Sequence, residues 1–193
     1  GVWMTPANTM INADIFAVLA SGGHYVNVHT PANPSGELRG QILTSNYLFT
    51  SFKLSGAQEA PAVDTDASGE AYALININDY GLELRVNTMG VDDATGAHIH
   101  TGRIGTNGDV LVALEQSMTD ASVWMAPANT MLNADIFAVL ASGGHYVNVH
   151  TPANAGGELR GQILTDNYAL VTFPLSGMQE VPAVDTMASG DGY

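Results

Sequence analysis

The chain has 193 residues, and its 19 acidic and 5 basic side chains give it a formal charge of −14 at pH 7. Five scattered cations cannot neutralise a phosphate backbone or hold an anionic lipid surface, which excludes nucleic acid and acidic membranes as partners. The absence of cysteine excludes thiol catalysis, disulfides and thiolate metal sites, and no apolar run approaches the roughly 20 residues that would be embedded across a membrane.

Alternation of apolar and polar residues with a period of two is the main pattern along the chain. It is clearest at 81–87, where Leu82, Leu84 and Val86 alternate with polar residues and predict a strand with one buried face. Residues 78–81 contain Asn, Asp and Gly, which are typical of a hairpin turn. In chain order, the predicted strands are 51–54, 70–78, 81–87, 97–101, 109–114, 146–151 and 158–165.

One segment, 130–142, has helical periodicity instead. Its apolar residues recur at i, i+4, i+7 and i+8, namely Leu132, Ile136, Val139 and Leu140. We expect Asn129 or Thr130 to cap its start and the glycines at 143–144 to end it. Many short strands with one short helix in about 120 residues predict an all-β Greek-key sandwich or barrel.

The chain is also self-similar. Residues 1–72 recur as 122–193 at a constant offset of 121, with 16 differences, so that 56 of 72 positions are identical. We therefore predict that 1–46 is the C-terminal part of a preceding repeat, 47–167 a complete repeat, and 168–193 the N-terminal part of the following repeat. On this interpretation the chain is cut from a longer tandem series of near-identical units.

Histidines are the main side chains in the complete repeat that are suited to metal binding or catalysis. His98 and His100 are two residues apart on a predicted strand, so their imidazoles project to the same face. His150 lies on another predicted strand and is a third candidate ligand. His145 follows the helix, where its direction is uncertain, and His29 is the counterpart of His150 in the preceding repeat.

Two interpretations of these histidines stay open. In one, they form hydrogen bonds across the sheet and fix loops. In the other, which we favour because a His-x-His pair is combined with a third histidine, they bind a metal ion. Nitrogen ligands suit copper or zinc better than calcium or magnesium. Near them, Glu158 and Arg160 are expected to form an exposed pair on one face, and 103–109 to form a turn that supports the His-x-His strand.

Four segments in order carry a family resemblance: LSGAQEAPAV at 54–63, AHIHTG at 97–102, YVNVHT at 146–151 and GELRGQI at 157–163. Together they resemble the CHRD domain, which is named after chordin and also occurs in secreted bacterial proteins. CHRD domains are in turn similar in outline to the Greek-key barrel of copper–zinc superoxide dismutase. That likeness implies a copper ion held by His98, His100 and His150.

The same likeness raises the alternative of a dismutase-like enzyme. The sequence lacks the additional histidine that bridges copper to zinc in that enzyme, and an acidic surface repels superoxide. Catalysis is therefore the less favoured hypothesis, and an extracellular ligand-binding or adhesion module is a further alternative.

We favour an extracellular or cell-surface structural protein. The low charge and acidic sign fit an exported chain, and near-identical repeats with short linkers are expected to stack into a fibre or filament. The expected partners are identical neighbouring repeats or chains, together with divalent cations. The expected cofactor is copper, ahead of zinc or calcium.

Overall fold

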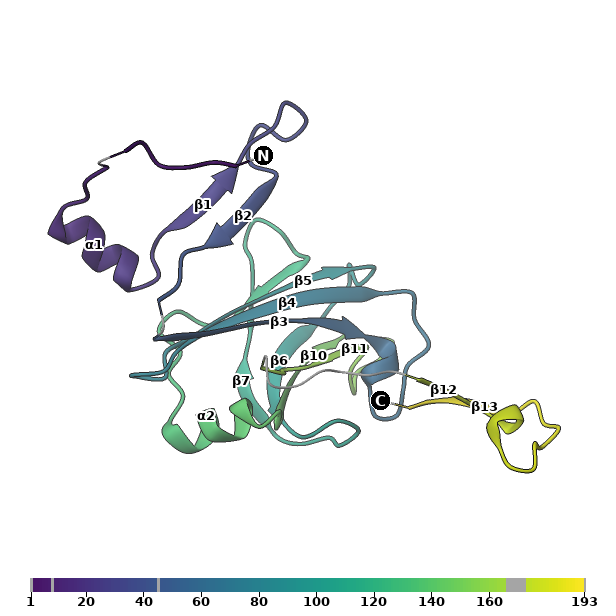
Figure 1. Ribbon diagram of the computed structural model, residues 1–193. Helices are drawn as coiled ribbons and strands as arrows, with labels where there is room; N and C mark the ends of the chain where they lie inside the picture. Colours follow the sequence, from purple (N-terminus) through teal and green to yellow (C-terminus); the bar gives the residue numbers. More distant parts are fainter. Residues whose placement is uncertain (1, 8, 45, 166–172, 193) are drawn as a thin grey trace. The chain divides into compact units, whose positions relative to one another are not determined.

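The structure is a computed structural model that describes residues 2–7, 9–44, 46–165 and 173–192 (Figure 1). The chain divides into two compact units. The first contains residues 1–48 and 76–78, and the second contains 49–75 and 79–193. The predicted boundary between the complete repeat and the following one, at residue 167, lies outside the described residues.

The first unit contains helix α1 (Ala13–Ala20) and the antiparallel strands β1 (Tyr25–Val28) and β2 (Leu38–Gln41). Asn12 caps α1, because its side chain accepts a hydrogen bond from the Ile15 amide at 2.8 Å. Among the described residues of 2–44, no hydrophobic side chain is buried. The local elements thus form here without a hydrophobic core.

The second unit contains a nine-stranded sheet in the order β7-β6-β10-β11-β3-β4-β5-β9-β8. Every strand register described for this sheet is antiparallel. The strands are β3 (Tyr47–Ser55), β4 (Ser68–Asn76), β5 (Leu82–Met89), β6 (Gly96–Thr101), β7 (Val110–Ala113), β8 (Glu115–Gln116), β9 (Val123–Met125), β10 (His145–His150) and β11 (Leu159–Gln162).

The two edge strands of this sheet, β7 and β8, are separated in sequence by Leu114 alone. Because one residue joins them, the two edges must meet, and the sheet curls into a nearly closed barrel (Figure 1). Leu114 itself is buried. The predicted all-β barrel is confirmed.

The barrel core follows the predicted alternation. In β5, Leu82, Leu84 and Val86 are buried, and the residues between them are exposed or half-buried. The β4–β5 hairpin turns through Tyr80, whose φ of 64° lies in the left-handed region. The strands β8 and β9 were not predicted, because segments of two and three residues are too short to show a period.

The predicted helix is present but shorter than expected. It is α2 (Ala134–Ala141), and its cap is Asn133, whose side chain accepts a hydrogen bond from the Ile136 amide at 2.9 Å. The prediction that Asn129 or Thr130 caps it was wrong. Asn129 has a φ of 62° and Thr130 donates to the Pro127 carbonyl, so both belong to a preceding turn. Gly143, with a φ of 71°, ends the helix as predicted.

Two further segments follow the barrel sheet. Strand β12 (Phe173–Ser176) continues into a 3₁₀ turn, η2 (Gly177–Gln179), and pairs with β13 (Ser189–Gly192) in a separate two-stranded sheet. The end of β3 leads into the matching turn η1 (Gly56–Gln58).

Within the described part of the chain, neither helix is long and apolar enough to cross a bilayer.

Packing in the barrel predicts that two leucines related by the offset of 121 contribute very differently to the free energy of unfolding. Leu54 is 1% exposed and Leu175 is 50% exposed. We expect Leu54→Ala to lower the free energy of unfolding by about 2–5 kcal/mol, because it leaves a cavity in the core. The matched change Leu175→Ala is expected to cost less than about 0.5 kcal/mol. Denaturant unfolding of dilute protein, followed by circular dichroism, measures both, and equal losses would contradict this packing.

Candidate metal centre

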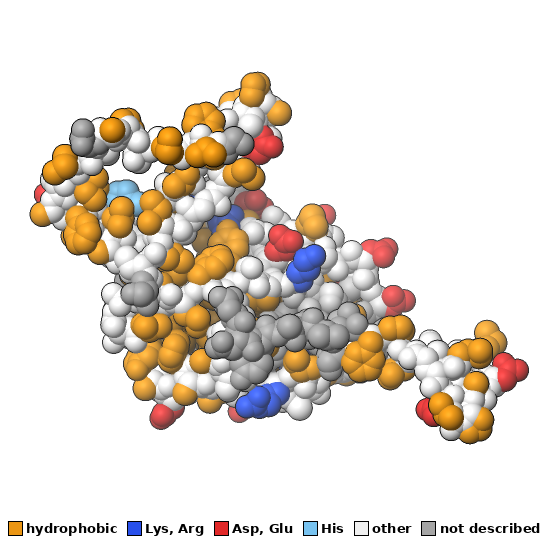
Figure 2. Space-filling view, viewed as in Figure 1, with side chains coloured by type: hydrophobic (Ala, Val, Ile, Leu, Met, Phe, Trp, Pro, Cys, Tyr) orange, Lys and Arg blue, Asp and Glu red, His pale blue; other side chains and the backbone are white. Residues whose placement is uncertain are grey.

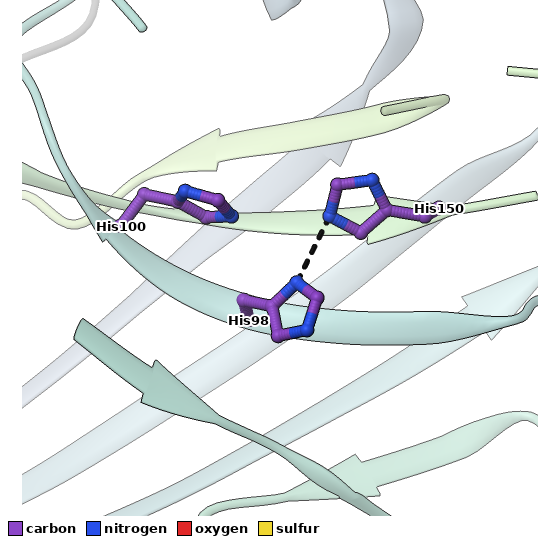
Figure 3. A group of neighbouring side chains, drawn as sticks. All are labelled: His98, His100 and His150. Carbon is purple, nitrogen blue, oxygen red and sulfur yellow. Dashed lines mark hydrogen bonds between the residues drawn. The ribbon is translucent and has the colours of Figure 1, made fainter. Parts of the chain in front are cut away.

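The candidate centre lies where β6 and β10 pair. In this register His98 is opposite Asn148, and His100 is opposite Tyr146. Residues that face each other across an antiparallel pair project to the same side, so His98 and His100 lie on the same side as His150. Figure 3 shows the three imidazoles turned toward a common point.

The distances bring the ring nitrogens close to the range of shared ligation. His98 Nδ1 lies 3.0 Å from His150 Nε2. One nitrogen from each of the three rings lies within 4.8 Å of the others. Nitrogens that share one ion, each about 2 Å away from it, are at most about 4 Å apart, so the widest separation is only slightly too large.

Backbone carbonyls set the tautomers of two of the rings. His100 Nδ1 lies 3.0 Å from the Gly108 carbonyl, and His150 Nδ1 lies 3.0 Å from the Ala155 carbonyl. Since a carbonyl oxygen only accepts, both Nδ1 atoms carry a proton, and the neutral form of each ring has its lone pair on Nε2. This is the arrangement by which proteins orient histidine ligands.

The tautomers of His100 and His150 are suited to a metal ion, whereas His98 Nδ1 carries the proton of a hydrogen bond and must release it to bind an ion through that atom. His150 Nε2 accepts from His98 Nδ1, whereas the buried His100 Nε2 has no hydrogen-bond partner. Burial lowers the pKa of His98, and the nearby His150 and His100 lower it further. Burial is also the main cause that lowers the pKa of His150. Neutral imidazoles are the form that binds metals.

The structure places the other two candidate ligands elsewhere. His145 is opposite Thr101 on β10, one residue out of phase with Tyr146, and is therefore on the core side of the sheet. Burial lowers its pKa. His29 is in the first unit, where its Nδ1 lies 2.8 Å from the Pro34 carbonyl, as His150 does with Ala155. Neither joins the group of three.

Sequence reasoning missed a stack of side chains behind His100. The rings of His100 and Tyr146 are parallel within 9°, with centroids 5.0 Å apart. The Arg160 guanidinium lies 3.5 Å from the centroid of the same Tyr146 ring. Arg160 is 1% exposed, so the expectation of an exposed pair with Glu158 was wrong for this residue. Stacking on Tyr146 fixes the orientation of the His100 ring, and the cation–π contact with Arg160 fixes Tyr146 in turn.

The predicted supporting role of 103–109 is confirmed. Arg160 donates to the Arg103 carbonyl at 2.8 Å and to the Thr106 carbonyl at 3.0 Å. The Gly108 carbonyl of the same segment accepts from His100. One loop thus fixes both ends of the stack.

Beside this stack lies a buried carboxyl that sequence reasoning also missed. The Asn148 amide donates to the two oxygens of Glu59 at 3.0 and 3.2 Å. Burial raises the pKa of Glu59 to about 7, against the opposing effects of the Arg160 charge and the Asn148 hydrogen bond. Gly157, with a φ of 135°, lies so close that a Cβ atom there would meet both Asn148 and Glu59.

Comparison with known proteins gives one family and one relative. The model of the CHRD domain matches residues 2–42 and 50–163. Chordin of Danio rerio is 26% identical over 175 residues, which cover 84% of this chain and 19% of that protein. The chain therefore spans about a fifth of the length of that relative. No solved structure matches the chain, so the likeness to superoxide dismutase stays a prediction.

The raised pKa of Glu59 predicts a pH dependence of stability. Between the ordinary value of 4.5 and about 7, the folded state keeps a proton that the unfolded state releases. Stability from this group is therefore complete below pH 4.5 and is lost as the pH rises to about 7. We expect Glu59→Gln to reduce this loss, because the amide does not ionise.

Urea unfolding of both proteins across this pH range measures the effect. The difference in unfolding free energy between Glu59→Gln and the unaltered chain isolates the Glu59 contribution. It should grow in favour of the variant with rising pH, and a difference that does not change with pH would contradict a raised pKa.

Proposed function

Because the chain belongs to the CHRD domain family, we propose that it is an extracellular or cell-surface structural protein whose complete unit binds one copper ion. The ligands are His98, His100 and His150. The likeness to Chordin and the acidic composition support placement outside the cell. The observation that carries the proposal is the convergence of three imidazoles on one point.

The environment of the three rings favours ligation over a purely structural role. In a structural cluster, each ring nitrogen would find a hydrogen-bond partner, because a buried polar atom without one costs free energy. Here the His100 Nε2 atom is buried without a partner, and the tautomer of the ring directs its lone pair into the cluster. A metal ion would satisfy that atom.

Copper is favoured by the chemistry of the ligands. Nitrogen-only donors discriminate against calcium and magnesium, which prefer oxygen. Between the remaining metals, copper(II) binds a given nitrogen site more tightly than zinc does. Zinc is therefore the alternative ion for the same three side chains.

The second part of the proposal is assembly into a filament of repeated units. The two copies of the repeated segment have the same helix cap, at Asn12 and Asn133, and the same strand register. Tyr25 pairs with Gln41 as Tyr146 pairs with Gln162. Near-identical units that share local structure are suited to a regular, repeating contact.

Titration of the 193-residue chain with copper(II) tests the metal site. We expect one tight site per chain, with a nitrogen pattern in the electron paramagnetic resonance spectrum. His150→Ala should weaken binding by about 100-fold or more, because it removes a direct ligand. The matched control is His29→Ala, which changes the same repeat position and should leave the tight site unaltered.

Two results would contradict the proposed site. One is the absence of tight copper binding by a chain whose circular dichroism shows it to be folded. The other is equal weakening by His150→Ala and His29→Ala, since His29 is not part of the group of three. Zinc binding in competition with copper decides between the two metals.

Electron microscopy of the native material tests the filament. We expect continuous filaments with a regular axial repeat, because short linkers between near-identical units restrict their relative motion. Images that contain only separate globules on flexible connections would contradict filament assembly and would leave the copper site untouched.

A further inference from the structure

The first unit exposes side chains that the second unit buries. Tyr25, Val26 and Leu38 are 48%, 54% and 65% exposed, whereas their counterparts at the offset of 121, in β10 and β11, are at most 2% exposed. Figure 2 shows hydrophobic side chains spread over the surface of the first unit. The same residues are thus buried in one copy of the repeated segment, and in the other they are exposed apolar side chains on both sides of the strand pair.

The second unit shows which strand lies at the edge of this strand pair. Strand β3 lies beside β11, with Ser55 opposite Arg160. The approach is close at Gly161, where an added Cβ would lie 2.7 Å from the Lys53 carbonyl oxygen and 2.8 Å from Leu54 Cγ. Beyond the strand, the Gln162 amide donates to the Gln58 side chain at 3.3 Å.

In the first unit the equivalent place is open. Gly40 is the counterpart of Gly161, and an added Cβ at Gly40 would meet nothing within 4 Å. Glycine in a strand is characteristic of places where another backbone approaches closely. The sequence of β2 therefore retains the residue that admits a neighbouring strand, while no described residue lies against it.

The chain also carries a segment with the sequence of the missing strand. Strand β12 and turn η2 repeat the end of β3 and turn η1, and the identical positions include Phe173, Leu175 and Ser176. Leu175 is 50% exposed, whereas Leu54, its counterpart in β3, is 1% exposed. An apolar strand end is thus exposed after the complete unit in the sequence, and the strand edge that would receive it is open before it.

We propose that β12–β13 of one copy of the chain docks beside β2 of a second copy, in the register that β3 and β11 have inside the complete unit. Ser176 then lies opposite the partner's Arg39, and Leu175 covers the partner's Gly40. The contact is head-to-tail, so each copy both donates and receives, and the assembly grows in one direction. The inference rests on the proposed filament and specifies its joint.

Disulfide trapping between two single-cysteine chains tests this register, since the natural chain has no cysteine. Chains with Arg39→Cys and Ser176→Cys are mixed under mild oxidation, with one of them isotope-labelled. Directly opposed residues of antiparallel strands have Cα atoms about 4.5–5.5 Å apart, within the range of a disulfide. We expect mixed dimers of labelled and unlabelled chains, identified by mass spectrometry.

Matched variants establish specificity. Gly40→Val on the Arg39→Cys chain should lower the yield of mixed dimers about tenfold, because the side chain fills the space that the strand would occupy. Gly156→Val is the control, because an added Cβ at Gly156 also meets nothing within 4 Å. Ser35→Cys in place of Arg39→Cys is the control for random collision, because Ser35 lies outside β1 and β2.

The proposed joint is overturned if mixed dimers do not form, if Ser35→Cys gives the same yield as Arg39→Cys, or if Gly40→Val has no more effect than Gly156→Val. Copper titration and electron microscopy of the unaltered chain are run in parallel. Tight copper binding and filaments without trapping would remove this joint alone. Trapping without copper binding would remove the metal site alone.

Discussion

The antiparallel pairing of β6 with β10 is the interaction on which the candidate metal centre depends. It places His98 and His100 on the side of the sheet from which His150 projects. A shift of one residue in this register would send the His-x-His pair into the core. The buried side chains Ile99, Val147 and Val149 prevent that shift, because they fill the opposite side of the same two strands. Hydrophobic packing on one face thus fixes the chemistry on the other.

A second constraint is the buried charge of Arg160. A guanidinium in a protein interior is stable only if its donors are satisfied, and here the carbonyls of Arg103 and Thr106 accept from it. Those bonds fix the loop whose Gly108 carbonyl orients His100. The Tyr146 ring lies between Arg160 and His100. One buried cation therefore stabilises the loop, the aromatic ring and the tautomer of a candidate ligand together, which gives it a positioning role.

The sequence predicted the parts of the fold that depend on local patterns. Alternation predicted the β4–β5 hairpin, and the two-residue spacing of His98 and His100 predicted their common face. The stack and the Glu59–Asn148 pair could not be predicted, because they join residues 14 to 89 positions apart. Arg160 looked exposed because arginine usually is, and its burial comes from the loop at 103–109, which is distant in sequence. The cap of α2 was misassigned because several Asn and Thr residues precede the helix, and only tertiary contacts decide among them.

The two copies of the repeated segment show how far local sequence determines structure. In both, Asn caps the helix, the two strands pair in the same register, and an arginine lies 3.5 Å from the centroid of a tyrosine ring. Burial differs completely, since Tyr146 is 2% exposed and Tyr25 is 48% exposed. Local hydrogen bonds and contacts within a few tens of residues are thus encoded in the segment itself, whereas its core requires strands from elsewhere. The strand pair β1–β2 is already folded in the correct register, so it loses little conformational entropy when such a strand binds. Strand addition therefore completes the unit at a low entropic cost.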